Sequence, residues 1–307
     1  MTALKFTWNP VSGIDLGFIT IHFYSLMFVV TFASCFYLMK PIFKREGIKK
    51  EKLDSLFIYT VIAIVLGMRL GHVIFYQTEL IWEDPLAVLL PISTQNGFEF
   101  TGFRGLASHG AVVGVLVSMY YYNKKVLKKS WLWILDRLAV VSGIGAMFVR
   151  LGNFFNSEMI GHSTDSAIGI KFIQHEISKG KAVSLTKIQN PQKAYQALTD
   201  DPQFSSIISE LPYRYPGQLM EATGYLLVFF ILMFLYWKTE ARKKPGLLLG
   251  AFLLLLMGVR IIVERFKEVQ VEGREEWFLN TGQLLSIPFI LIGLYLVYNA
   301  LTKKEAI

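Results

Sequence analysis

The chain has 307 residues, of which 53% belong to the apolar set AVILMFWYC and 18% are charged, against about 25% charged in an ordinary soluble domain. A soluble domain of this length cannot bury so much apolar surface in one core, and the composition also excludes a disordered or collagen-like chain. The formal net charge is +8, and the single cysteine, Cys35, excludes an internal disulfide and a multi-cysteine metal site. A membrane protein with several spans is therefore predicted.

Seven apolar stretches are long enough to cross about 30 Å of hydrocarbon, where the backbone must be helical because it finds no water. In chain order they are residues 18–39, 55–77, 105–123, 132–150, 217–237, 246–264 and 279–300. Residues 86–90 are apolar but too short to span, which predicts a helix lying at the interface. The expected fold class is an all-α polytopic membrane protein with about seven transmembrane helices.

The connection 151–216, between the fourth and fifth spans, contains four prolines and scattered charges. This composition predicts a small folded cap of mixed structure on the outer surface. We therefore expect a single membrane domain over residues 1–307, with a periplasmic cap inserted at 151–216.

Lys and Arg are distributed unevenly over the connections. Sixteen of the 31 lie in 40–54, 124–131, 238–245 and the C-terminal tail, whereas the opposite short connections hold five. Short cytoplasmic segments carry the excess of positive charge, so the N-terminus is predicted outside and the C-terminus in the cytoplasm. An odd number of spans likewise requires the two ends to lie on opposite sides of the membrane. The first span is not a cleaved signal peptide, because its basic cluster follows the apolar run.

With this orientation, polar residues from all seven spans fall at one depth, in the outer half of the membrane. They are His22, Tyr24, Arg69, His72, His109, Arg150, Asn153, Gln218, Glu221, Arg260, Glu264 and Gln283. An ionisable group inside a bilayer costs roughly 2.5–3.5 kcal/mol on insertion scales, so this convergence favours a functional site. Plainer interpretations stay open: His22 could snorkel to the interface, and Glu264 could be a structural partner of Arg260. Arg69 could belong to an ion pair used in packing.

Residues 149–161 read Val-Arg-Leu-Gly-Asn-Phe-Phe-Asn-Ser-Glu-Met-Ile-Gly. Arg150 closes the predicted fourth span, Gly152 permits a sharp exit, and Asn153, Asn156 and Glu158 supply hydrogen-bonding groups. This run, R-x-G-N-F-x-N-x-E-x-x-G, resembles the signature of the prolipoprotein diacylglyceryl transferases. Other stretches are similar to motifs of that family and follow its order: 67–76, 108–114, 215–221, 260–264 and 280–286.

The resemblance covers about residues 15–300, with three departures. His72 stands where the family more often has tyrosine, and Ala111 stands where many members have glycine. Leu256 lies four residues before Arg260, where several members carry a tyrosine, so no role of that tyrosine carries over.

The resemblance implies a transfer reaction at the outer face of a bacterial inner membrane. The diacylglyceryl group of phosphatidylglycerol moves to the thiol of a lipobox cysteine near the signal peptide of a secreted prolipoprotein, and glycerol-1-phosphate leaves. Because the thiol belongs to the substrate, the enzyme needs no catalytic cysteine. No cofactor and no metal are expected, since the five histidines show no ligand spacing. The partners implied are the lipid, the prolipoprotein and the bilayer, with no nucleic acid.

The same resemblance suggests roles for individual side chains. Arg150 and Arg260 are expected to hold the phosphate, because a guanidinium fork donates hydrogen bonds in pairs. His109 is the candidate general base or thiol orienter, because a thiol with a pKa near about 8.5 must lose its proton. Arg69 supports either role, and Glu264 orients Arg260. The other expected site residues are Asn153, Glu158 and Gly161, which shape the mouth of the site, and Tyr24 and Gln283, which contact substrate.

A membrane transporter or channel for an anionic solute is the alternative from another class, since embedded arginines also suit anion permeation. The polar groups stop at the outer half of the membrane, however, and no polar stripe reaches the inside. An enzyme that uses the same lipid with another acceptor is a second alternative, against which only the motif resemblance speaks.

Overall fold

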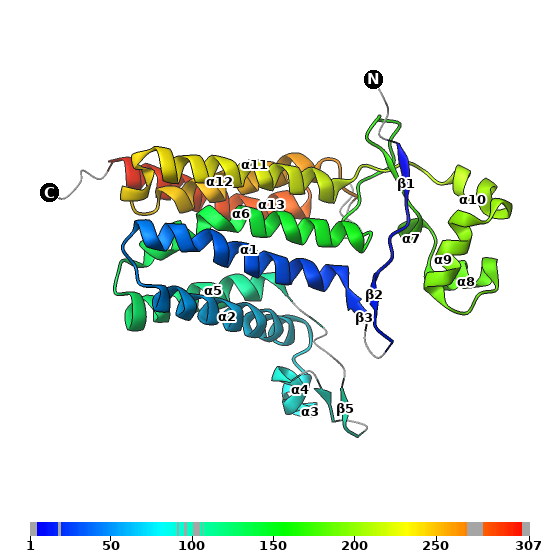
Figure 1. Ribbon diagram of the computed structural model, residues 1–307, viewed down its shortest axis with the longest axis horizontal. Helices are drawn as coiled ribbons and strands as arrows, with labels where there is room; N and C mark the ends of the chain where they lie inside the picture. The colour runs from blue at the N-terminus through cyan, green and yellow to red at the C-terminus, as the bar shows by residue number, and fades with distance from the viewer. Residues whose placement is uncertain are drawn as a thin grey trace. The chain divides into compact units, whose positions relative to one another are not determined.

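The computed structural model describes residues 5–17, 20–90, 92–94, 97–100, 105, 107–268 and 279–302. The chain divides into two compact units. The first comprises Met1–Cys35 and Ala139–Ile307, and the second comprises Phe36–Leu138. The division falls inside helix α1 (Phe23–Arg45) and inside helix α6 (Trp131–Phe155). Helices dominate both units (Figure 1).

Six helices among the described residues are long and apolar enough to cross a membrane. They are α1, α2 (Lys50–Tyr76), α6, α11 (Gly217–Lys238), α12 (Leu247–Glu264) and α13 (Thr281–Thr302). The predicted third span corresponds to α5 (Ser108–Tyr122), whose 15 residues continue as a π-helical turn, η1 (Asn123–Leu127). Fifteen residues reach only about 22 Å at 1.5 Å per residue, less than the hydrocarbon thickness. The all-α polytopic class is confirmed, and the seventh span stays a prediction.

Two helix ends differ from the predicted ones in ways that matter for the site. The first span begins at Phe23, because residues 20–22 form strand β3 (Thr20–His22), which pairs antiparallel with β2 (Gly13–Asp15). Residues 18 and 19, where the span was expected to begin, lie outside the described residues. Helix α6 runs past Arg150 to Phe155, so Gly152 is not an exit from the helix. A Cβ on Gly152 would lie 3.0 Å from the ring of Tyr24, so this glycine instead makes room for that ring.

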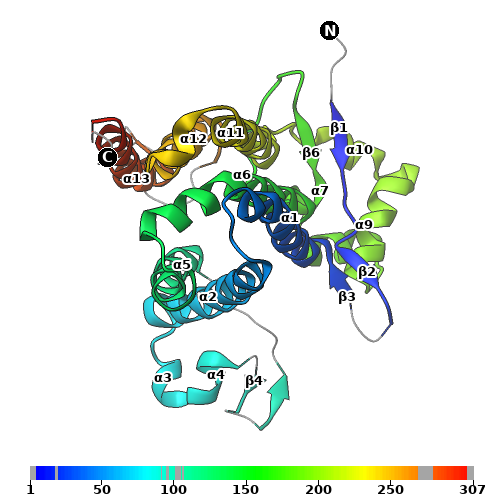
Figure 2. The same cartoon turned by 60° about the vertical axis from the view of Figure 1, so that its left-hand side comes forward.

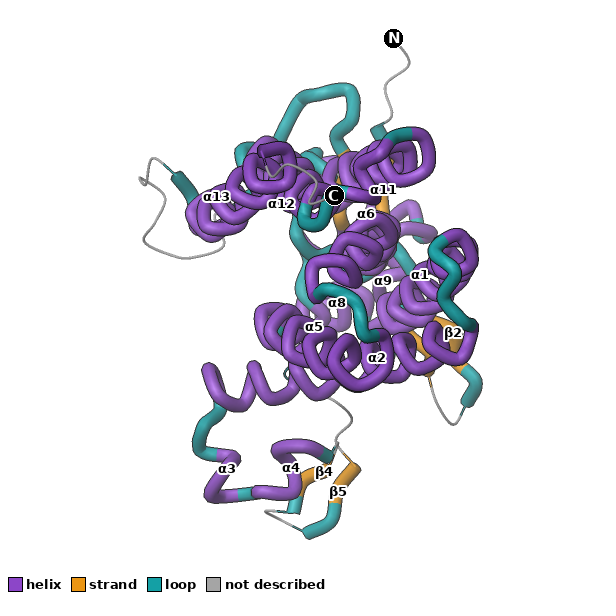
Figure 3. The backbone as a smooth tube through the Cα atoms, turned by 90° about the vertical axis from the view of Figure 1, so that its left-hand side faces the viewer, coloured by secondary structure: helices purple, strands orange, loops and turns teal. Residues whose placement is uncertain are grey.

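In the second unit, α2 packs against α5 at very short range. A Cβ on Gly67 would lie 2.4 Å from the carbonyl oxygen of Gly110, and a Cβ on Gly110 would lie 2.1 Å from that of Gly67. Small residues at this spacing let the two backbones approach. Beyond α2 the chain forms α3 (Leu80–Glu83), α4 (Pro85–Leu89) and a hairpin of β4 (Ile92–Ser93) and β5 (Glu99–Phe100), grouped together in Figure 3.

In the first unit, α12 packs between α11 and α13 (Figure 2). The connection from α6 to α11 folds around its own apolar cluster. Its elements are β6 (Ile170–Phe172), α7 (Ile173–Glu176), α8 (Lys179–Thr186), α9 (Pro191–Asp200), η2 (Pro202–Phe204) and α10 (Ser205–Glu210). The cluster consists of Ile173, Ile177, Ala182, Ala194, Tyr195 and Leu198. Strand β6 pairs in parallel with β1 (Phe6–Trp8), which attaches the N-terminal segment to this connection.

Candidate active site

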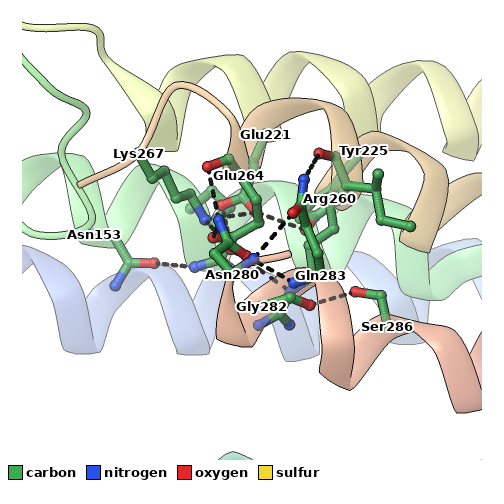
Figure 4. A network of polar contacts seen from close by, with 12 residues as sticks. Asn153, Glu221, Tyr225, Arg260, Glu264, Lys267, Asn280, Gly282, Gln283 and Ser286 are labelled. Atoms are coloured by element: carbon green, nitrogen blue, oxygen red, sulfur yellow. Dashed lines mark hydrogen bonds and ion pairs between the residues drawn. The ribbon is translucent and has the colours of Figure 1, made fainter. Parts of the chain in front are cut away.

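A buried cluster of charged side chains joins α6, α11 and α12 in the first unit (Figure 4). Arg150 Nε on α6 lies 2.9 Å from Glu221 Oε2 on α11. Lys267, three residues beyond the end of α12, places its Nζ 3.0 Å from Glu221 Oε1 and 3.1 Å from Glu264 Oε1. Arg260 Nε lies 3.8 Å from Glu264 Oε1, which is too long for a hydrogen bond. Glu264 is therefore shared between Lys267 and Arg260, and Lys267 holds it more closely.

The five groups carry three positive and two negative charges, so the cluster has a formal charge of +1. The side chains of Lys267, Glu221 and Glu264 are at most 6% exposed, whereas those of Arg150 and Arg260 are 16% and 33% exposed. Buried ions need oppositely charged partners, and an excess positive charge in a low-dielectric site attracts an anion. The two arginines are the cations that such an anion can reach.

Polar groups of α11 and α13 surround the carboxylates. The hydroxyl of Tyr225 donates to Glu221 Oε1 at 3.2 Å. Asn280 Nδ2 donates to the backbone oxygen of Glu264 at 3.0 Å and to its Oε2 at 3.3 Å. Asn280 Oδ1 accepts the backbone N–H of Gln283 at 2.9 Å, and Gln283 Oε1 accepts the backbone N–H of Asn280 at 3.1 Å. Gln283 Nε2 donates to the backbone oxygen of Ile261. These bonds fix the start of α13 against the end of α12 and occupy the amide of Gln283.

The signature run extends the cluster through a chain of hydrogen bonds. Arg150 Nη1 donates to Asn153 Oδ1 at 3.2 Å, and Asn153 Nδ2 donates to Glu158 Oε2 at 3.4 Å. Ser157 and Met159, on either side of Glu158, have φ of 53° and 59°. A residue with a Cβ loses about 1–2 kcal/mol of stability when its backbone adopts this left-handed conformation. The loop therefore holds Glu158 in place at a cost in folding stability.

Gly161 has a packing role in the same loop. It forms an antiparallel bridge with Lys267, and its N–H donates to the backbone oxygen of Tyr215 at 2.8 Å. A Cβ at this position would lie 2.2 Å from the backbone oxygen of Phe266. Only glycine lets these three backbone segments meet, and their meeting places Lys267 in the cluster.

Arg69 and His109 lie in the second unit. Arg69 is buried, and its guanidinium donates to the backbone oxygens of Ala87 and Val88 at the end of α4, which is a packing role within that unit. His109, in the first turn of α5, is exposed and makes an edge contact with the ring of Phe75, 4.9 Å between centroids. The structure therefore gives Arg69 backbone partners and leaves the imidazole of His109 accessible.

Asp84 anchors the segment that Arg69 contacts. Its carboxylate accepts from the backbone N–H of Thr94 at 2.7 Å and from the Thr94 hydroxyl at 2.8 Å. These bonds to the charged form hold the pKa of Asp84 below its ordinary value. The same carboxylate accepts from the N–H of Ala87 and so caps α4.

Lys267 and Glu221 are the members of the cluster that the sequence argument did not assign to the site. Lys267 was counted among the cations of an outer connection, and Glu221 was noted only for its depth. A signal for Lys267 was present, because Arg260, Glu264 and Lys267 follow a spacing of four and three residues, which is one helical face.

Six apolar helices among the described residues and a buried cluster with a formal positive charge define a multi-pass membrane protein with a cationic site. The family described as "Prolipoprotein diacylglyceryl transferase" matches residues 12–299. The chain belongs to this family. It is similar to a phosphatidylglycerol–prolipoprotein diacylglyceryl transferase of Chloroherpeton thalassium, with 33% identity covering 95% of this chain and 92% of the relative.

Proteins of the same name in two further bacteria are also similar. The relative from Tolumonas auensis is 33% identical, covering 97% of this chain and 98% of the relative. The relative from Porphyromonas gingivalis is 36% identical, covering 85% and 82%. These names describe transferases, and they do not favour a transporter for an anionic solute.

Proposed function

We propose that this protein transfers the diacylglyceryl group of phosphatidylglycerol to the cysteine thiol of a prolipoprotein lipobox, the first step of lipoprotein maturation. The observation that carries the proposal is the buried cluster with a formal charge of +1 and two accessible arginines. The phosphodiester of phosphatidylglycerol carries one negative charge. Its binding would leave the cluster neutral.

The bond changes explain why cations are needed. The thiolate sulfur attacks the glyceryl carbon that carries the phosphate, a C–S bond forms, and the C–O bond to the phosphate breaks. The electron pair of that bond leaves with glycerol-1-phosphate, so the phosphate group gains negative charge as the bond breaks. Positioned donors that meet a developing charge lower the barrier, and in this proposal Arg150 and Arg260 supply them.

The thiol proton requires a base. His109 is our candidate, because a neutral imidazole accepts a proton near pH 7 and its ring is exposed at the first turn of α5. A free cysteine thiol has a pKa of about 8.5, so at neutral pH it carries a proton that a base must take up. Arg69 supports the unit that contains His109, because its guanidinium donates hydrogen bonds to backbone oxygens of α4.

The remaining residues hold the site in shape or line it. Hydrogen bonds through Asn153 and Glu158 connect Arg150 to the signature loop, the part of the signature run that follows α6 (residues 156–161). Gly161 joins that loop to Lys267. Tyr24 lines a cavity beside Glu158 and contacts substrate in this proposal. Glu264 positions both Arg260 and Lys267, and Gln283 fixes α13.

We further propose that the protein lies in a bacterial inner membrane as one membrane domain of seven spans. Its N-terminus and the connection 151–216 then face the periplasm, and its C-terminus faces the cytoplasm. The excess of Lys and Arg in 40–54, 124–131 and 238–245 supports this orientation.

Purified protein incubated with phosphatidylglycerol and a lipobox peptide tests the proposal. Mass spectrometry is expected to find the peptide heavier by one diacylglyceryl group, with glycerol-1-phosphate released in equal amount. A peptide with the cysteine changed to serine is the control, and it should gain no mass, because a hydroxyl is far less acidic than a thiol. No gain by the cysteine peptide, or an equal gain by the serine peptide, would contradict the mechanism.

A further inference from the structure

A cavity of about 660 Å³ lies beside the signature loop, within the first unit. Its wall comes from the start of α1, the loop after α6, and the helices α7 to α9. The volume falls in the range of ligand pockets, roughly 300–1,000 Å³. The lining residues used below are Tyr24, Ser25, Asn156, Glu158, Lys179 and Gln192.

Hydrogen bonds hold the wall in place without any ligand. The side chain of Gln192 accepts from the N–H of Ser12 at 3.4 Å, and Gln174 Nε2 donates to the backbone oxygen of Pro10 at 2.6 Å. Asn190 caps the N-terminus of α9. The segment before β2 is thereby fixed to the helices of the connection, and the cavity is already formed.

The cavity communicates with the charged cluster through side chains already described. Asn156 Nδ2 donates to Glu158 Oε1 at 3.3 Å, and both residues line the cavity. The other oxygen of Glu158 accepts from Asn153, which in turn accepts from Arg150. A ligand bound against Glu158 is therefore two side chains away from the group proposed to hold the phosphate.

The lining suits a polypeptide better than a lipid. The hydroxyls of Tyr24 and Ser25 and the ammonium of Lys179 make no hydrogen bond with the described residues, so they are free to donate to peptide carbonyl oxygens. The carboxylate of Glu158 can accept a peptide N–H, whereas it would repel a phosphate.

The position of the cavity agrees with this chemistry. Tyr24 and Ser25 lie in the first turn of α1, and α6 ends at Phe155, so the cavity lies past the ends of two apolar helices. The residues after the acceptor cysteine belong to an exported protein and must leave the apolar layer near the site of transfer. A cavity next to that site, whose lining includes free hydrogen-bond donors and an acceptor carboxylate, offers them a place.

We propose that this cavity binds, in extended form, the residues of the acceptor polypeptide that directly follow the acceptor cysteine. The proposal rests on the transferase function proposed above and adds a second contact region for the same substrate. Four extended residues span about 13 Å. Recognition would then depend on backbone groups beyond the cysteine.

Two peptides with the same lipobox test the proposal, one continuing five residues past the cysteine and one ending at the cysteine as an amide. The wild type should show a KM about tenfold lower for the longer peptide, which corresponds to two or so hydrogen bonds. Lys179→Ala combined with Ser25→Ala should raise the KM of the longer peptide toward that of the shorter one. Its kcat, and its KM for phosphatidylglycerol, should stay within about twofold, less than the effect of one hydrogen bond.

Lys181→Ala is the matched control, because Lys181 is exposed on the same helix, α8, and does not line the cavity. If the double variant fails to fold, Lys179→Ala alone serves, since that exposed side chain has no hydrogen-bonding partner among the described residues. Equal KM values of the wild type for both peptides would overturn the subsite. A rise in KM for phosphatidylglycerol, or for both peptides alike, would also overturn it and indicate a lipid headgroup site instead. Modification of neither peptide by the wild type would overturn the proposed function, and the subsite with it.

Discussion

Three cations share two carboxylates in the cluster, and Arg150 is the one whose geometry a lysine cannot copy. Its Nε bonds to Glu221 while its Nη1 bonds to Asn153, so one planar group bridges two partners from α6 and α11. An ammonium is a compact point charge on a flexible stem and cannot hold both directions and a phosphate as well. The function of Arg150 therefore requires the geometry of a guanidinium as well as its positive charge.

We predict that Arg150→Lys is nearly as inactive as Arg150→Ala, with turnover lowered by about 10²–10³, the usual effect of losing one positioned donor to a developing charge. The measurement is turnover at matched membrane abundance with saturating phosphatidylglycerol. Arg265→Lys, an exposed position just beyond α12, is the control and should keep normal turnover. Near-normal turnover of Arg150→Lys would mean that Arg150 is an anchor or a bulk charge.

Lys267 is predicted to act through stability and lipid binding. Lys267→Met leaves Glu221 and Glu264 without their common partner, and removing one member of a buried ion pair costs about 3–5 kcal/mol. The melting temperature and the affinity for phosphatidylglycerol should both fall. Adding Glu264→Gln removes one of the stranded charges, so the double variant should be more stable than the sum of the single effects predicts. Additive losses in melting experiments would show that Lys267 and Glu264 are not coupled.

The sequence indicated Arg150, Arg260 and Glu264 because a charge inside an apolar run is conspicuous. The sequence did not indicate Lys267 as a site residue, because it lies beyond the end of α12, where a cation is typical of the protein surface. Its burial depends on the bridge to Gly161, a contact more than 100 positions away in the chain. Long-range backbone pairing of this kind leaves no local pattern in the sequence.

At the scale of elements, hydropathy located the helices better than their ends. Helix α1 continues to Arg45 and α6 to Phe155, past the last residues of their apolar runs. The first turn expected for α1 is a strand, because Thr20–His22 pair with β2 and satisfy their backbone groups there. Helix ends are decided by capping and tertiary contacts, which apolarity alone does not encode.

Packing of α2 against α5 gives a prediction with an internal control. Gly110→Ala would place a methyl group 2.1 Å from the backbone oxygen of Gly67, so the helices must separate, at about 1–3 kcal/mol for overpacking. Gly258→Ala on α12 meets nothing within 4 Å and should stabilise that helix by up to about 1 kcal/mol. Thermal unfolding of the two purified variants compares the same substitution in a tight and an open site. Equal melting temperatures would show that α2 and α5 adapt freely.

At the scale of the whole molecule, the composition identified a membrane protein, and the charge distribution supplied an orientation. The folded connection between α6 and α11 was predicted only in outline, since its small core combines Ile173 on α7 with Leu198 on α9 and has no single periodic pattern. The sixteen Lys and Arg on the predicted cytoplasmic side would also attract anionic lipids, each contributing about 1 kcal/mol near the surface.

The orientation itself can be tested by labelling single cysteines in a Cys35→Ala background. Lys125→Cys and Lys243→Cys lie at exposed positions of connections rich in Lys, so an impermeant thiol reagent should reach them only after the cytoplasm is opened. Gln189→Cys, exposed between α8 and α9, should react in intact cells. Lys243 is the decisive position, because five spans precede it and an odd number is needed to place it inside. Six spans, with α5 not crossing, would expose Lys243→Cys to the outside, and its labelling in intact cells would contradict the seven-span arrangement.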